Sequence, residues 1–137
     1  MCERATSLSE RSKSYKDLLV WQKSLALVKL IYELPRSFPQ DERFGLVTQM
    51  RRAAVSVPSN IAEGQSRHTS GEFIQFISHA EGSLAELDTQ VLIAIELGFC
   101  TQFQADGILS LIDESQRMLN GLRQKLATRH SPLATYA

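Results

Sequence analysis

Residues that break regular structure are scarce in this sequence. Its 137 residues include only 7 glycines and 4 prolines, too few for the many turns of an all-β sandwich. There are also only two cysteines, Cys2 and Cys100, and neither has a second ligand at metal-site spacing. A disulfide-rich scaffold is therefore excluded, and the length favours one domain with one hydrophobic core.

Long hydrophobic runs are missing as well. The longest apolar stretch, VLIAIELGF, is interrupted by Glu96 and falls short of the roughly 18 residues that suggest a membrane span. The first fifteen residues, MCERATSLSERSKSY, are polar and of mixed charge, unlike a signal peptide. We therefore expect no membrane association and a cytoplasmic location in which the thiols stay reduced.

An excess of charge of one sign is absent from the whole chain but present locally. The 15 basic residues balance 15 acidic ones, whereas a dedicated nucleic-acid binder usually shows a stronger basic excess. Residues 71–100 contain five acids and no lysine or arginine. An acidic helix set against a mildly basic remainder can guide the docking of subunits or partners.

Motifs for catalysis are not evident. No glutamate is followed three residues later by histidine, the pair used by di-iron bundles. His68, His79 and His130 are dispersed, and no glycine-rich phosphate loop occurs. The sequence predicts a protein that is not an enzyme and that needs no metal or cofactor.

Four segments carry apolar residues at the alternating spacing of three and four that is typical of amphipathic helices. The first spans about residues 16–35, the second begins near Asp41 or Phe44 and ends at Gly64, and the third and fourth begin at Thr69 and Thr101. The predicted core lines are Leu18, Trp21, Leu25, Val28 and Tyr32 in the first; Leu46, Met50, Ala53, Val57 and Ile61 in the second; Phe73, Ile77, Ala80, Leu84, Leu87, Val91 and Ala94 in the third; and Ala105, Ile108, Ile112, Ser115, Leu119, Leu122 and Leu126 in the fourth.

Signals for helix ends support these segments. Thr69 with Glu72, and Thr101 with Gln104, have the spacing of capping boxes. Gly64 and Gly98 suit C-terminal caps. Short connections make successive helices antiparallel, so we predict an all-α, up-down-up-down four-helix bundle over residues 15–130, with flexible tails at 1–14 and 131–137.

The stretch SVPSNIAEG, residues 56–64, interrupts the second helix with Pro58. A proline inside a helix typically costs roughly 3 kcal/mol, but the apolar line keeps its phase across it. The separate piece from 58 to 64 would be marginal alone. We predict one helix kinked at Pro58.

A stripe of polar residues lies beside the apolar line of the second helix. The third helix carries a similar polar stripe, which we expect to face it. We predict an interhelix polar network, in preference to a ligand or catalytic site, because buried polar groups must be satisfied. Its predicted members are Arg52, Asn60, Glu63 and Glu86.

The end of the third helix is apolar nearly all round. One bundle buries only one face of a helix, so the surplus indicates a contact with another subunit. Packing under the adjacent loop and the first helix is the alternative. The predicted interface residues are Leu92, Ile93, Ile95, Phe99 and Phe103.

Three blocks resemble the 23S rRNA-intervening-sequence family of four-helix bundle proteins. They are DLLVWQKSLALVKLIY (17–32), FPQDERFGLVTQMRRAAVSVPSNIAEG (38–64) and FIQFISHAEGSLAELDTQ (73–90). The resemblance covers most of residues 16–125, and QMRRAAVSVPSNIAEG is its most specific part. It implies a link to ribosomal RNA genes, because members of the family are encoded in insertions within them.

The family is also related to the accessory protein of diversity-generating retroelements, which forms a five-subunit ring and works with a reverse transcriptase and nucleic acid. By this resemblance we expect a homo-oligomer, most simply a pentamer, that contacts RNA or DNA through basic residues. Arg51 and Arg52 match the family block, and Arg43 and Arg67 lie nearby. The alternative is a protein–protein interaction scaffold with no nucleic-acid role.

Overall fold

The computed structural model describes residues 14–130, and the side chains of residues 14–128. The predicted tails therefore lie outside the described residues, apart from Ser14. Four α-helices make up most of the fold: α3 (Leu19–Glu33), α4 (Leu46–Gln65), α5 (Ser70–Glu96) and α6 (Gln102–His130). Three short 3-10 helices, η1 (Tyr15–Asp17), η2 (Leu34–Ser37) and η3 (Gln40–Glu42), lie before and after α3. No strand occurs in residues 14–130, and the all-α prediction is confirmed.

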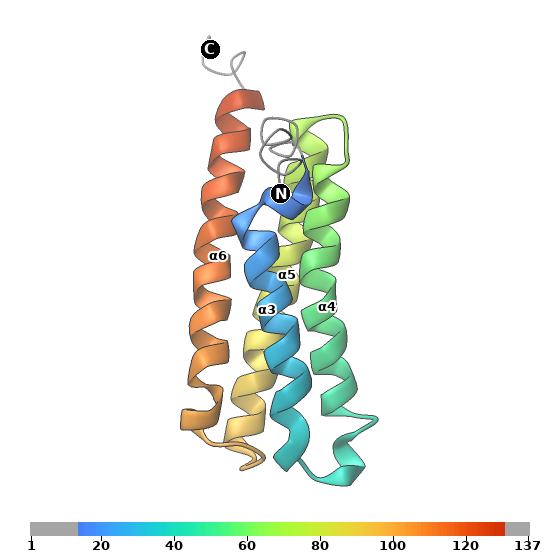
Figure 1. Cartoon of the computed structure of the whole chain (residues 1–137), viewed down its shortest axis with the longest axis vertical. Coiled ribbons are helices and arrows are strands. Elements are labelled where there is room, and N and C mark those ends of the chain that lie inside the picture. Colours follow the sequence, from blue (N-terminus) through green and yellow to red (C-terminus); the bar gives the residue numbers. More distant parts are fainter. Residues whose placement is uncertain (1–13, 131–137) are drawn as a thin grey trace, which may run out of the picture.

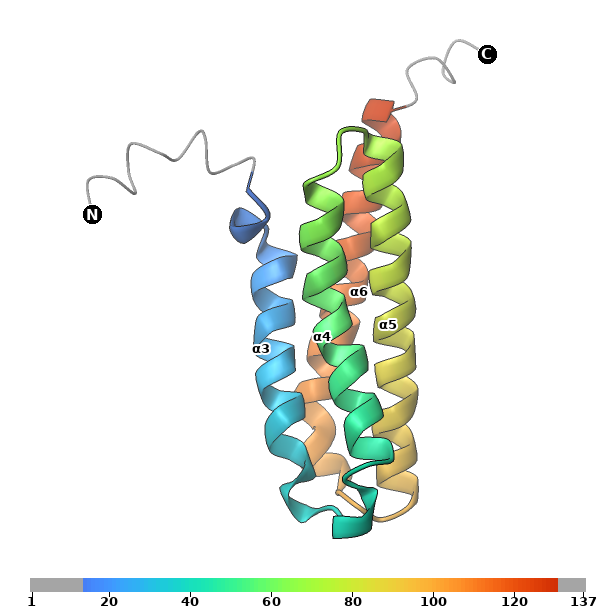
Figure 2. The same ribbon diagram turned by 90° about the vertical axis from the view of Figure 1, so that its right-hand side faces the viewer.

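The four long helices lie side by side as one elongated bundle (Figures 1 and 2). Helix α3 packs against α4 and α6, and α5 packs against the same two helices. Figure 1 shows the chain running in opposite directions in successive helices. Both α3–α4 and α5–α6 are joined at the same end of the bundle, which brings η2 and η3 close to the start of α6.

The helix ends follow the capping signals of the sequence. Thr69 accepts a hydrogen bond from the backbone N–H of Glu72 at 3.1 Å. At the start of α6 the box is reciprocal: Thr101 Oγ1 accepts from Gln104 N–H at 3.1 Å, and Gln104 Oε1 accepts from Thr101 N–H at 2.9 Å. Gly98 has φ +78°, in the left-handed region. Glycine ends a helix in this conformation without the steric strain that a Cβ would cause.

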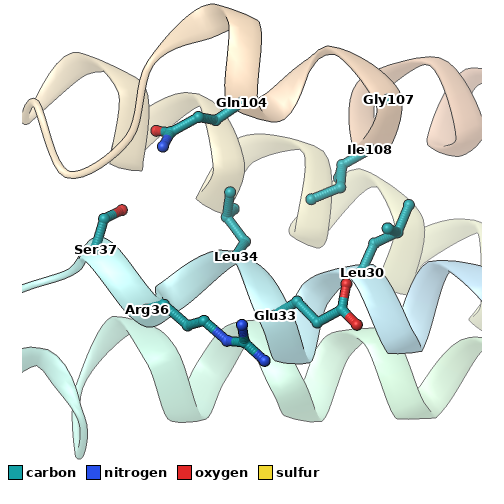
Figure 3. A pocket seen from close by; sticks show the side chains of 8 residues that line it. All are labelled: Leu30, Glu33, Leu34, Arg36, Ser37, Gln104, Gly107 and Ile108. Atoms are coloured by element: carbon teal, nitrogen blue, oxygen red, sulfur yellow. The ribbon is translucent and has the colours of Figure 1, made fainter.

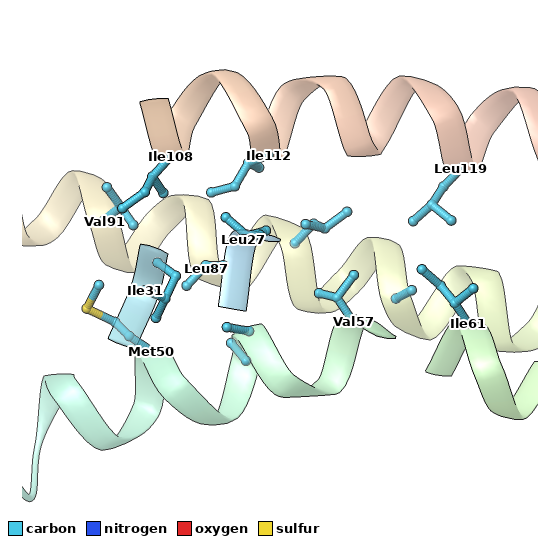
Figure 4. Close-up of a cluster of buried hydrophobic side chains, with 14 of the residues drawn as sticks. Leu27, Ile31, Met50, Val57, Ile61, Leu87, Val91, Ile108, Ile112 and Leu119 are labelled. Carbon is cyan, nitrogen blue, oxygen red and sulfur yellow. The ribbon is translucent and has the colours of Figure 1, made fainter. Parts of the chain in front are cut away.

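The core is a continuous column of apolar side chains from all four helices (Figure 4). The predicted line of α5 is buried at every position, and those of α4 and α6 are buried at all but Leu46 and Leu122. Within residues 14–130, no helix is both long enough and apolar enough to cross a membrane.

The predicted core line of α3 is wrong in part: Leu18, Trp21 and Val28 pack against the core but are only partly buried. The buried residues of this helix are Val20, Ser24, Leu27 and Ile31. Leu25 and Tyr32 of the predicted line are 44% and 47% exposed. Helix α3 carries two neighbouring apolar lines, and its periodicity alone does not say which of them meets the other helices.

Helix α4 is continuous through Pro58, which is buried within it. The proline lacks the N–H that would bond to Ala54, yet the helical turns on both sides keep the apolar face in register. The prediction of one helix across Pro58, made from the spacing of the apolar residues, is confirmed. The kink itself stays a prediction.

Gly64 is not a helix cap, contrary to the sequence prediction. It lies inside α4, which ends at Gln65 with Ser66 as its cap. A Cβ built at Gly64 would lie 2.7 Å from Phe73 Cδ1 and 2.7 Å from Phe76 Cβ. Glycine is needed here because α5 approaches α4 too closely for any side chain.

Ser115 gives a test of the core. Its side chain is 0% exposed, and its Oγ has no hydrogen-bond partner among the described residues. Because a buried unpaired hydroxyl costs about 1–3 kcal/mol, Ser115→Ala is expected to raise the free energy of unfolding by about 1 kcal/mol, measured by urea denaturation. The matched control is Ser24→Ala: Ser24 is equally buried, but its Oγ donates to Trp21 O at 2.6 Å. An equal gain in both variants would contradict the argument.

Candidate nucleic-acid interface

The arginines fall into two groups according to their partners. Among the seven arginines whose side chains the structure describes, three have a carboxylate within ion-pair distance: Arg67 with Glu63 at 3.0 Å, Arg117 with Asp113, and Arg123 with Glu81. The other four have no carboxylate within 4 Å in the described part of the chain. They are Arg36, Arg43, Arg51 and Arg52.

These four arginines gather at one end of the bundle, which we call the basic end. Arg36 lies in η2 and Arg43 directly follows η3. Arg51 and Arg52 lie in the first two turns of α4, which η3 precedes. Arg67 is separated from them along α4 by about 20 Å at 1.5 Å per residue, so it does not join this group.

Arg51 is fixed in place by α3. Its Nη2 donates to the backbone O of Tyr32 at 3.1 Å, and its guanidinium lies 4.5 Å from the centre of the Tyr32 ring. A cation over an aromatic face is stabilised by the ring quadrupole. Its Nε is buried and has no partner among the described residues. Arg51 therefore combines a structural contact between α3 and α4 with a positive charge at the surface.

Two shallow cavities open at the basic end. The first, which we call the Tyr32 cavity, has a volume of about 470 Å³ and is lined by Tyr32, Thr48, Arg51, Arg52, Val55 and Ser56. The second, the Pro39 cavity, has a volume of about 300 Å³ and is lined by Pro35, Arg36, Phe38, Pro39, Gln40, Arg43, Val47 and Arg51.

Arg51 lines both cavities, and neither is lined by an aspartate or a glutamate. The acids next to lining residues in the sequence are Glu33, which follows Tyr32, and Asp41 and Glu42, which belong to η3. Glu42 Oε1 accepts from the backbone N–H of Leu46 at 3.3 Å, so this carboxylate is engaged at the start of α4. The cavities form a positive surface with polar hydroxyl and amide groups beside it.

A third cavity adjoins the basic end on the side of α6 (Figure 3). It has a volume of about 360 Å³ and an apolar floor made by Leu30, Leu34 and Ile108. Arg36 lines it together with Glu33. Since it contains a carboxylate, it does not extend the positive surface.

The predicted polar network is replaced by a different one. The bridge between α4 and α5 is a hydrogen bond of 2.8 Å between Ser56 Oγ and Ser83 Oγ. Asn60 Nδ2 donates to the O and Oγ of Ser56 within α4. The small serines allow the helices close approach, and the longer side chains satisfy themselves locally.

The charged members of the predicted network bond elsewhere. Glu63 pairs with Arg67, and Glu86 Oε2 accepts from Gln90 Nε2 at 3.2 Å within α5. Arg52 is exposed at the Tyr32 cavity. The four predicted residues therefore do not bond to one another in the described structure.

The predicted interface residues divide into two sets. Leu92 and Ile93 are 48% and 42% exposed, and Phe103 is 87% exposed. Ile95 and Phe99 are partly buried against the chain's own core, and the Phe99 ring lies 5.5 Å from that of Phe38. Leu97, 59% exposed, joins the first set. We call Leu92, Ile93, Leu97 and Phe103 the apolar patch.

Side chains for metal or nucleophilic chemistry do not converge in the described part of the chain. No three His, Cys, Asp or Glu residues of residues 14–128 lie close enough to hold a metal ion. Burial raises the pKa of the Cys100 thiol, which keeps it in the unreactive protonated form at neutral pH. Cys2 lies outside the described residues.

Some features of the basic end were not predicted from the sequence. Arg36 lies outside the specific QMRRA block, and its place beside Arg43 depends on the fold of η2 and η3. Tyr32 was assigned to the core line of α3. The only available signal was the sequence RSFPQDERF, in which Arg36 and Arg43 flank Pro39, a residue that disfavours one continuous helix.

The fold and this surface define a class of protein: a small antiparallel helical bundle with unpaired arginines at one end. The family model described as 23S rRNA-intervening sequence protein matches residues 16–121. The chain belongs to this family, as its sequence blocks suggested. Comparison with curated proteins gives no match.

Proposed function

We propose that this chain is a non-enzymatic, homo-oligomeric accessory or scaffold protein of the cytoplasm that contacts RNA or DNA through its basic end. One observation carries the nucleic-acid part of the proposal. All four described arginines without a carboxylate partner gather around two adjacent cavities that contain no acidic residue.

Phosphate oxygens are suitable partners for this surface. Guanidinium groups bind phosphate with two parallel hydrogen bonds, and the Arg43 and Arg52 side chains are exposed. A polyanion that neutralises them releases counterions, so binding is expected to weaken as salt rises. The overall charge is zero, and Glu33, Asp41 and Glu42 belong to this end of the bundle. None of these carboxylates lines either basic cavity, so the positive charge of the cavities is available to a phosphate.

The test removes two exposed charges from the basic end. Arg43→Gln with Arg52→Gln is expected to weaken binding of a fluorescent 20-nucleotide strand at least tenfold in fluorescence anisotropy, since charge-assisted hydrogen bonds contribute about 1.5–3 kcal/mol each. The slope of log K against log salt should fall by about 2. Arg51 is left unchanged because its replacement would also break the contact with Tyr32.

The matched control is Arg67→Gln with Arg117→Gln. It removes the same number of charges, but from arginines that are paired with Glu63 and Asp113. Affinity in this variant is expected to stay within about threefold of the parent chain, by the small contribution of exposed ion pairs. No binding by the parent chain, or equal losses in both variants, would contradict a specific role for the basic end.

The oligomeric part of the proposal rests on two separate apolar surfaces. The apolar patch belongs to the end of α5 and the start of α6. A groove of about 320 Å³ between α3 and α4 is lined by Trp21, Leu25, Val28, Val55 and Pro58, among others. Contact of one surface with the other on the next copy is heterologous, and such contacts give a ring when the rotation between successive copies closes. The resemblance to the retroelement accessory protein supports five copies.

The protein–protein scaffold without a nucleic-acid role remains the second candidate. The exposed apolar side chains favour it, because surfaces of this kind bind proteins. It predicts that the parent chain forms the oligomer but binds no oligonucleotide.

A further inference from the structure

We propose that the basic end selects unpaired nucleic-acid strands over duplexes, by stacking exposed bases on Phe44 and on the Arg51–Tyr32 pair. This inference rests on the proposed function and specifies its ligand. The shared chemistry is a phosphodiester backbone with unstacked bases, from either RNA or DNA.

Phe44 is placed as a stacking residue. It lies between η3 and α4, directly after Arg43, and its side chain is 88% exposed. The ring therefore contributes little to the core, and its removal should leave the bundle intact. An aromatic ring beside a cation allows one nucleotide to stack its base while its phosphate is neutralised.

The second platform is the Arg51–Tyr32 pair. Tyr32 is 47% exposed, and the Arg51 guanidinium lies over its ring at 4.5 Å. Both side chains line the Tyr32 cavity with Arg52. Planar guanidinium groups and aromatic rings both stack on bases, and the hydrogen bond from Arg51 to Tyr32 O fixes this pair before a ligand arrives.

The shape of the basic end favours the single strand. The cavities are small and concave, about 470 and 300 Å³, whereas duplex DNA is read by an element that enters a groove. Bases inside a duplex are already stacked and cannot reach a ring on the protein without being flipped out. A single strand offers the same phosphates together with free base faces.

The test compares 20-nucleotide single strands of DNA and RNA with blunt duplexes of the same length in one buffer, by fluorescence anisotropy with the full chain. Each single strand is expected to bind at least tenfold more tightly than its duplex. Phe44→Ala should weaken binding of the single strands about fivefold or more, by the usual contribution of base–aromatic stacking. Duplex affinity and the salt slope should stay unchanged.

Phe103→Ala is the matched control. Phe103 is 87% exposed and lies at the same end of the bundle. It belongs to α6, and no arginine precedes or follows it in the sequence, whereas Phe44 directly follows Arg43. Light scattering on both variants separates a change in assembly from a change in binding. A Phe103 variant that keeps the parent mass should bind the single strands as the parent does.

The outcomes separate this inference from the proposed function. Binding of duplexes as tightly as single strands in both the DNA and RNA arms, or equal effects of the two phenylalanine variants, would overturn the selection of unpaired strands while nucleic-acid contact stands. Absence of binding to every probe would overturn the proposed function itself. A preference for the single strand over the duplex, with DNA or with RNA, supports the inference. The nucleic acid that shows this preference is then the ligand.

Discussion

Replacing Gly64 with alanine is expected to lower the free energy of unfolding by about 1–3 kcal/mol, the range for forcing extra atoms into a packed core. The new Cβ would overlap Phe73 Cδ1 and Phe76 Cβ, each at 2.7 Å. The Phe76 contact is at a Cβ, which cannot turn away without moving α5. Gly64→Val should cost more, because it adds two further methyl groups to the same space. Urea denaturation followed by circular dichroism measures both variants.

The sign of the Gly64→Ala effect is diagnostic. In an exposed helix, alanine is more favourable than glycine by about 1 kcal/mol. Gly121 in α6 is exposed, and a Cβ there would have no neighbour within 4 Å. Gly121→Ala is therefore expected to stabilise the bundle. If Gly64→Ala also stabilises it, the close approach of α4 and α5 at this point is not a constraint on the fold.

The contrast between Gly64 and Gly98 shows what periodicity can predict. Both glycines end an apolar line, and both were assigned to caps. Only Gly98 has the positive φ of a cap. At position 64 a glycine is required because α5 lies too close for a side chain. Sequence spacing reports the phase of one helix, but it does not report how closely a second helix lies.

The same limit explains the error in α3 and the polar bridge. The buried lines of α4, α5 and α6 could be predicted because each is the one regular apolar line on its helix. Helix α3 offers two, and the choice of Val20, Ser24, Leu27 and Ile31 depends on the neighbours α4 and α6. The bridge from Ser56 to Ser83 likewise depends on the distance between helices.

The basic end could be found from the sequence only in part. Arg43, Arg51 and Arg52 were proposed from a family resemblance, while Arg67 was included although it pairs with Glu63. Arg67 and Arg117 follow their partners Glu63 and Asp113 by four residues, a pairing that the sequence spacing already indicates. The partner of Arg123 is Glu81 of another helix, so this pairing depends on the fold. The other four described arginines carry a charge that no carboxylate in residues 14–128 lies close enough to neutralise.

Introducing two carboxylates into the apolar patch is expected to dissociate the proposed oligomer. Leu92→Glu with Ile93→Glu changes side chains that are 48% and 42% exposed in the single chain, so the bundle should stay folded. Burying an unpaired charge in an interface costs several kcal/mol, and about 4 kcal/mol weakens association roughly a thousandfold. Multi-angle light scattering at micromolar concentration should give an oligomer for the parent chain and a single-chain mass for the variant.

The matched control, Gln75→Glu with His79→Glu, adds the same two charges to exposed positions near the other end of α5. It should keep the parent mass, because residues 75 and 79 lie several turns from the apolar patch. Helical circular dichroism must be retained in both variants, which separates loss of assembly from loss of folding. A monomeric parent chain would contradict the oligomer, and an unchanged mass in the Leu92/Ile93 variant would place the contact on another surface.

The basic end and the apolar patch involve different side chains. The dissociated Leu92/Ile93 variant therefore also tests whether a single copy suffices for binding nucleic acid. If each copy contributes its own phosphate contacts, the monomer should bind a long strand more weakly and with a smaller salt slope.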